Sequence, residues 1–117
     1  MKTSKAYFEK FKAEFLKWQK ELGLTQYRID FFHENLEDSF AQVTVNELGK
    51  VACVKLCTKL SKDDVKCDRG PESNARHEVL HLLTNRLRWL GSCRYIETAD
   101  LDEEWEAVVV RLEKVLK

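Results

Sequence analysis

Apolar and polar residues alternate along this chain with two different periods, and the first of them is helical. Over residues 4–22 large apolar side chains recur every three or four positions, separated by lysines and glutamates, and Gly23 follows. These apolar positions are Phe8, Phe11, Phe15, Trp18 and Leu22. The spacing predicts an N-terminal helix that buries an aromatic face and ends at the glycine.

A period of two residues follows and predicts three strands. The alternating apolar positions are Tyr27, Ile29 and Phe31, then Ala41, Val43 and Val45, and then a third run over residues 51–60. The segment NELGK at residues 46–50 separates the last two runs and has the composition of a turn. We therefore expect a hairpin there, within a three-stranded, mostly antiparallel sheet.

The second half of the chain returns to helical spacing. After the polar stretch SKDDVKCDRG, Pro71 stands where the first turn of a helix tolerates proline, and residues 71–90 are expected to be helical. Asp100, with Glu103 three residues later, has the pattern of an N-cap for a final helix. The expected core face of that helix consists of Trp105, Val108, Val109, Leu112 and Leu116. The order helix, three strands, helix, helix predicts an α+β fold.

Length and composition narrow the class of protein. A chain of 117 residues forms one domain with one modest core, and its 20 basic and 20 acidic residues leave no net charge. Nothing therefore draws the whole molecule to nucleic acid or to an anionic membrane. No signal peptide or membrane-spanning run is visible, so we expect a cytoplasmic monomer with reduced cysteines.

The segment ARHEVLHLL at residues 75–83 carries the candidate chemistry. His77 and His81 are four residues apart, so on a helix they lie about 6 Å apart and can both direct a nitrogen at one cation. Glu78 lies beside His77, where its carboxylate could take a proton from water that the metal activates. The pattern H-E-x-x-H thus predicts a catalytic metal site. The alternative is that both histidines simply line a partly buried helix face.

Other potential metal ligands follow weaker patterns. HENLE at residues 33–37 lacks a second histidine, and we interpret His33 as an ordinary turn residue. Cys53 and Cys57 would lie about 13 Å apart on a strand, too far for one ion or one disulfide. We expect reduced thiols at all four cysteines, Cys53, Cys57, Cys67 and Cys93.

A catalytic zinc ion needs a third protein ligand, and no histidine follows His81 in the chain. The extended pattern H-E-x-x-H-x-x-G-x-x-H fails, because Thr84 and Leu87 stand at its last two fixed positions. The final helix offers four acids: Asp102, Glu103, Glu104 and Glu106. We rank Glu106 first, because it borders the expected core face, then Glu104 and Glu103. For each acid the alternative is a solvated helix face.

The chain resembles a zincin fold in minimal form, and specifically the small zinc metallopeptidases encoded by bacteriophages and bacteria. The resemblance extends over FKAEFLKWQKELGL, YRIDF, ARHEVLHLL and EEWEAVVVRLEKVL, of which only HEVLH is a specific motif. It implies zinc ligands at His77 and His81, a general base at Glu78 and a third ligand best matched by Glu106. It also implies that residues 51–60 form the edge strand along which a peptide substrate lies. Either Tyr95 or Arg94 could stabilise the oxyanion.

These patterns lead to one main functional hypothesis and two alternatives. The main hypothesis is a zinc-dependent peptidase acting on a peptide or protein substrate. The first alternative keeps the zinc but makes the protein a non-catalytic peptide-binding or regulatory module. The second, a nucleic-acid-associated protein, is weaker, because the charge is balanced and no binding motif is present. It would rely on Arg69, Arg76, Arg86, Arg88 and Arg94.

Overall fold

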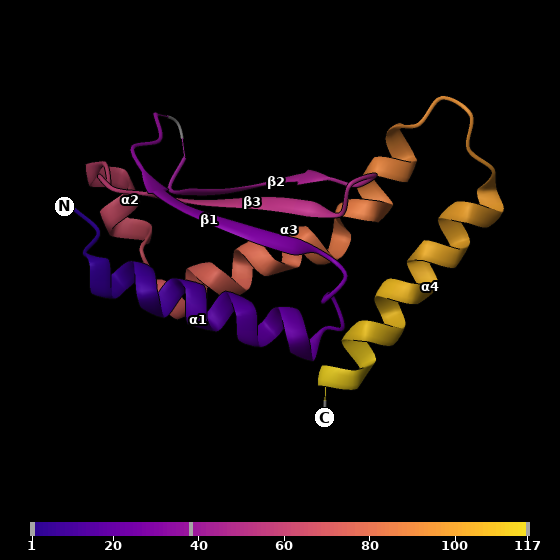
Figure 1. The fold of residues 1–117 in the computed structure, drawn as a ribbon, viewed down its shortest axis with the longest axis horizontal. Coiled ribbons are helices and arrows are strands. Elements are labelled where there is room, and N and C mark those ends of the chain that lie inside the picture. The colour runs from indigo at the N-terminus through magenta and orange to yellow at the C-terminus, as the bar shows by residue number, and fades with distance from the viewer. Residues whose placement is uncertain (1, 38, 117) are drawn as a thin grey trace.

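The computed structural model describes residues 2–37 and 39–116, apart from the side chains of Asp64 and Cys67. Within this part the chain forms an α+β fold in the predicted order, with one short additional helix (Figure 1). The elements are α1 (Lys5–Glu21), β1 (Arg28–Glu34), β2 (Ala41–Asn46), β3 (Val51–Cys57), α2 (Lys62–Cys67), α3 (Pro71–Ser92) and α4 (Thr98–Val115). The sequence pattern did not predict α2, which lies in the polar stretch after β3.

The caps of α1 confirm the predicted N-terminal helix. The Ser4 hydroxyl accepts a hydrogen bond from the Tyr7 N–H (3.0 Å), which satisfies one of the free amides of the first turn. The helix ends before Gly23, whose positive φ of 70° is a conformation that suits glycine. Beyond this turn, the buried Gln19 amide donates to the carbonyls of Leu24 and Tyr27, both at 3.0 Å. These two bonds direct the chain into β1.

The sheet is mixed, so the prediction of a mostly antiparallel sheet is wrong. The strand order is β1-β3-β2, with β1 parallel and β2 antiparallel to β3. The register places Glu34, the end of β1, opposite Cys57, and Ala41, the start of β2, opposite Leu56. β1 therefore ends, and β2 begins, beside the C-terminal end of β3, on opposite sides of that strand. After the end of β1, the Leu36 N–H donates to Cys57 Sγ (3.3 Å).

This order also corrects the expected substrate edge. The strand predicted over residues 51–60 ends at Cys57 and lies in the centre of the sheet, hydrogen-bonded on both sides. Among the described strands, β1 and β2 are the edges. Any peptide that extends the sheet must therefore add to one of these two strands and not to β3.

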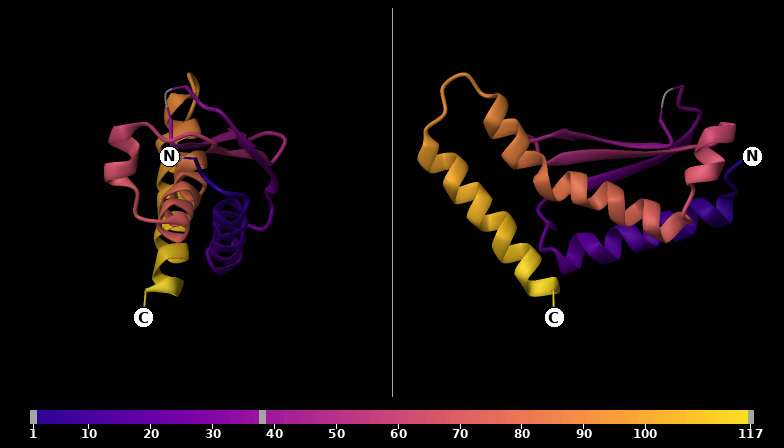
Figure 2. Two further views of the ribbon diagram at one scale, coloured as in Figure 1. Left: turned by 90° about the vertical axis from the view of Figure 1, so that its left-hand side faces the viewer. Right: turned by 180° about the vertical axis from the view of Figure 1, so that it is seen from behind.

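Both long central helices pack on one face of the sheet. Figure 2 shows α1 and α3 side by side beneath the strands. The inward side chains of β3, namely Ala52, Val54 and Leu56, are fully buried against the helices. Phe15 of α1 is fully buried as well and meets Phe31 of β1 edge to face, with ring centroids 5.5 Å apart. This single core fixes α3 against the sheet.

The last helix begins earlier than predicted, and only part of its predicted core face packs. It starts at Thr98, with Glu97 as N-cap residue, so the predicted cap at Asp100 is wrong. Val108 is buried and Leu112 packs against the core, as predicted, but Trp105 is 63% exposed and Leu116 is 76% exposed, so these two lie outside the core. From the end of α3 the helix runs back at an angle toward the end of α1 (Figure 1). None of the described helices combines the length and apolar character needed to cross a bilayer.

Candidate metal centre

The candidate site lies on α3, and the start of this helix sets which residues face outward. Pro71 occupies the first helical position, where its missing N–H costs nothing. Gly70 precedes it with a φ of 96°, and Asp68 Oδ1 accepts the Gly70 N–H (2.9 Å). From this start the helix turns Ala75 and Val79 into the core. The histidine positions therefore emerge beside the core rather than within it.

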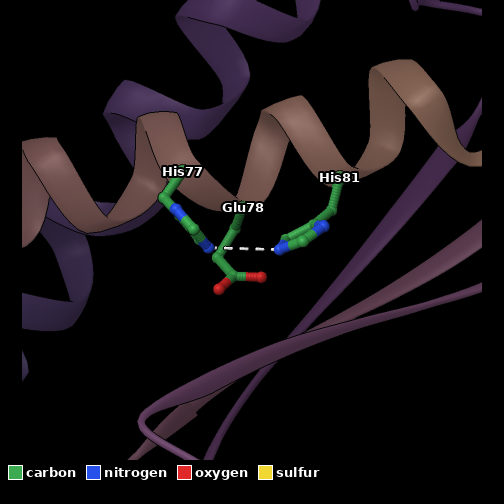
Figure 3. A group of neighbouring side chains, drawn as sticks. All are labelled: His77, Glu78 and His81. Carbon is green, nitrogen blue, oxygen red and sulfur yellow. Dashed lines mark hydrogen bonds between the residues drawn. The ribbon is translucent and has the colours of Figure 1, made fainter.

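The two histidines converge as the sequence spacing predicts. Their Nε2 atoms lie 3.1 Å apart, and the ring planes cross at 79° (Figure 3). Two ligands held at 2.0–2.1 Å by one tetrahedral zinc ion lie about 3.3 Å from each other. The observed separation therefore fits a shared zinc ion. Both rings are exposed, so a metal ion can reach them from solvent.

Glu78 completes the cluster and lies deeper than the histidines. It is 7% exposed, and its carboxylate projects to the same side of α3 as the two rings (Figure 3). The ligand atoms of the three residues lie within 4.8 Å of one another. Burial raises the pKa of Glu78 to about 7. With a pKa close to neutral pH, a carboxyl group can both accept and release a proton. No described residue donates a hydrogen bond to it.

A groove between α3 and the edge strand β2 leads past this cluster. One pocket, of about 420 Å³, has β2 as one wall and His77, Glu78 and His81 on the other. A second pocket, of about 560 Å³, continues beyond His77 and Glu78 toward the residues that precede α3. Ala41 of β2 lines both. The site can therefore admit an extended molecule that lies along the edge strand.

The structure does not bring the predicted third ligand to the histidines. Glu106 and Glu103 line a separate pocket with Lys20 and Gly23, at the far end of α1. Glu104 pairs instead with Arg86, at 3.2 Å. These acids lie elsewhere because α4 turns away from the groove after leaving α3. The fourth acid considered, Asp102, is exposed.

The sequence pattern did not predict a hydrogen-bonded cluster that lies beside the groove. Asp68 Oδ1 accepts from the Tyr7 hydroxyl (2.8 Å) and from Asn74 Nδ2 (2.9 Å), in addition to Gly70. Burial alone would raise the pKa of Asp68, but these donors outweigh it and hold the pKa below its usual value. Asp68 two residues before a Gly-Pro pair is a turn signal that could have indicated its role. Tyr7 is 61 residues away, and no local pattern connects it with Asp68.

The remaining candidates lie outside the groove. Tyr95 is 89% exposed beneath the Arg94 guanidinium, and neither residue lines either pocket of the groove. His33 is a strand residue rather than a turn residue, and its Nε2 lies 2.6 Å from the Thr3 hydroxyl. The cysteines with described side chains are free thiols, as predicted: Cys53, Cys57 and Cys93. The side chain of Cys67 lies outside the described part.

The comparisons with known proteins identify no relative. No protein-family model, no curated protein and no solved structure matches the chain. The class that can be stated from the fold is therefore an α+β protein with a three-stranded mixed sheet. In the part of the chain that the structure describes, one group of potential metal ligands is close enough to hold one ion, namely His77, Glu78 and His81.

Proposed function

We propose that the protein is a zinc-dependent peptidase with a zincin-like fold, in which His77 and His81 bind the metal and Glu78 is the general base. The observation that carries this proposal is the 3.1 Å separation of the two Nε2 atoms with the Glu78 carboxylate beside them. The cluster faces a groove whose other wall is an edge strand. Free thiols also support the proposed cytoplasmic location, because that compartment is reducing.

The groove supplies the means to position a peptide. As an edge strand, β2 can pair with the backbone of an extended peptide, which adds to the sheet as one more strand. Such a peptide passes directly in front of His77 and His81, because both line the same pocket as β2. We therefore assign to β2 the substrate-aligning role that the sequence had suggested for residues 51–60.

Glu78 would then move the protons of the hydrolysis. A zinc ion, when bound, supplies a Lewis acid that polarises the carbonyl and makes water more acidic. The Glu78 carboxylate takes one proton from the attacking water and delivers it to the leaving amine as the C–N bond breaks. Its buried position limits competition from bulk water for that proton.

Substitution of Glu78 tests the catalytic role directly. We expect wild-type protein to bind about one zinc ion, and His77→Ala to lose it. Glu78→Gln should keep zinc affinity within about threefold while cleavage of a fluorogenic peptide library falls roughly 10²- to 10⁴-fold. Glu72→Gln is the matched control, because Glu72 is an exposed acid in the first turn of the same helix. Wild-type protein that binds no zinc would contradict the proposal.

A non-catalytic zinc site is the second candidate, and one observation favours it. Glu78 is the acid that clusters with the two histidines in the described residues, so it is itself placed to be the third ligand. A carboxylate that binds zinc is not free to act as a base. In that case Glu78→Gln should lower zinc affinity about tenfold or more, and wild-type protein should bind peptides without cutting them. The same variant therefore separates the two functions.

A further inference from the structure

One face of α3 extends the candidate site beyond the histidines. Thr84 and Arg88 follow His81 at spacings of three and four residues, which keeps them on the same side of the helix. All of them line the pocket whose other wall is β2. This face of α3 therefore carries two potential metal ligands at one end and a positively charged side chain at the other.

Arg88 differs from the other arginines of this helix in having no partner among the described residues. Arg76 lies 3.5 Å from Glu14 of α1, and Arg86 lies 3.2 Å from Glu104 of α4. Arg88 makes no ion pair or hydrogen bond with any described side chain. The acid in its pocket is Glu78, two turns or more away along the helix. Its guanidinium is therefore free to bind a carboxylate that enters the groove.

Helix and strand geometry place Arg88 relative to the site of reaction. Seven residues separate it from His81, which is about 10 Å along the helix axis. An extended peptide advances about 3.3 Å per residue. If one residue of a peptide along β2 lies at the histidines, the third residue beyond it therefore lies next to Arg88.

The other half of the groove carries charges of both signs. The pocket beyond His77 is lined by two acids, Asp68 and Glu78, and one base, Arg69, together with neutral polar and apolar residues. An acidic side chain on that side of the histidines would face Asp68 and Glu78 as well as Arg69, so it would gain little. Selection for acidic side chains is thus confined to the Arg88 side.

We infer that the groove is selective for acidic peptides, and that Arg88 binds an aspartate or glutamate about three residues to one side of the bond at the histidines. This inference rests on the proposed peptide-binding function of the groove. It adds a specificity residue and a substrate class. A guanidinium and a carboxylate form two parallel hydrogen bonds, so both charge and shape are recognised.

The test measures peptide binding rather than cleavage. The protein is zinc-loaded Glu78→Gln, alone or combined with Arg88→Gln or with Arg76→Gln. The probes are three fluorescein-labelled decapeptides of alanine and valine that carry glutamate, glutamine or lysine at alternate positions. Dissociation constants come from fluorescence anisotropy. Both arginines are exposed and glutamine is a comparable helix former, so neither change should disturb the fold.

We expect the glutamate peptide to bind roughly two- to fivefold more tightly than the glutamine peptide, as for one exposed charged contact. Arg88→Gln should abolish this preference without weakening the glutamine peptide by more than about twofold. Arg76→Gln removes the same charge from the same helix but outside the groove, and should preserve the preference. Equal binding of all three peptides, or equal loss in both variants, would overturn the inference.

Cleavage by the wild-type protein separates this inference from the function on which it rests. If peptides are cut without regard to acidic residues, the peptidase proposal stands and the role of Arg88 is refuted. If the acidic peptide binds in an Arg88-dependent manner and is never cut, the inference stands and the catalytic proposal fails.

Discussion

Replacing Glu47 by glutamine should strongly destabilise the fold, although the substitution changes almost no volume. The Glu47 side chain is 2% exposed and lies in the turn between β2 and β3. It accepts hydrogen bonds from the Tyr27 hydroxyl (2.8 Å), from Lys50 Nζ (2.5 Å) and from Asn85 Nδ2 of α3 (2.9 Å). The network ties this turn to α3 one turn beyond His81. It therefore links the turn that follows β2 to α3 at a residue, Asn85, that lines the groove.

The magnitude follows from the number of donors around the carboxylate. A glutamine offers one acceptor oxygen, and its NH₂ group would face at least one of the donors now bound by the second oxygen. One buried donor left unsatisfied costs about 1–3 kcal/mol, and the charge-assisted bond to Lys50 is also weakened. We therefore expect a loss of about 3 kcal/mol. The entropy of unfolding for this chain length is about 0.25 kcal/mol/K, so Tm should fall by about 12 °C.

Urea denaturation at pH 7 and at acidic pH provides the assay. Burial alone would raise the pKa of Glu47, but hydrogen bonds from Lys50, Asn85 and Tyr27 outweigh it and lower the pKa. A carboxyl group whose pKa is lowered by folding stabilises the fold. This stabilisation is fully present above the unfolded-state pKa of about 4.3, and it is lost as the pH falls through the folded-state pKa. The difference between wild type and Glu47→Gln should thus shrink in acid.

A matched control and a clear contrary result complete this test. Glu113→Gln changes an exposed acid on α4 and should alter stability by no more than about 0.5 kcal/mol. If Glu47→Gln stays within that same limit at pH 7, the network does not hold the turn against α3, and the reasoning is refuted.

Two further predictions concern metal binding and packing. Free zinc at about 100 times its dissociation constant should stabilise the protein by about 2.7 kcal/mol, which is about 11 °C in Tm, and His81→Ala should abolish the shift seen by differential scanning fluorimetry. An equal shift in that variant would place the ion elsewhere. Phe15→Ala should cost about 3–5 kcal/mol, because this ring is fully buried, whereas Trp105→Ala should cost less than 1 kcal/mol, because this ring is 63% exposed. Chemical denaturation giving the reverse order would show that α4 buries Trp105 in solution.

The sequence by itself determined the local structure and the centre of the candidate site. Periods of 3.6 and 2 residues depend only on which side of one element is apolar, so helices and strands could be predicted within a few residues. The same holds for His77 and His81, because residues four apart on a helix meet whatever surrounds it. The short helix α2 was missed because its segment, at residues 62–67, is mostly polar and too short to show an apolar period.

Only the tertiary structure decided how these elements meet. Strand order depends on which side of β3 each of the other strands pairs with, and period-two alternation is identical for parallel and antiparallel neighbours. The apolar pattern of α4 contains more candidate positions than its narrow contact with α3 buries, so the pattern did not reveal which face packs. Glu106 was ranked from a predicted core face of which only Val108 and Leu112 pack in the core, and it lies away from the histidines. Partners that are distant in the chain, such as Tyr7 and Asp68 or Glu47 and Asn85, are chosen by packing, because no local interaction links them.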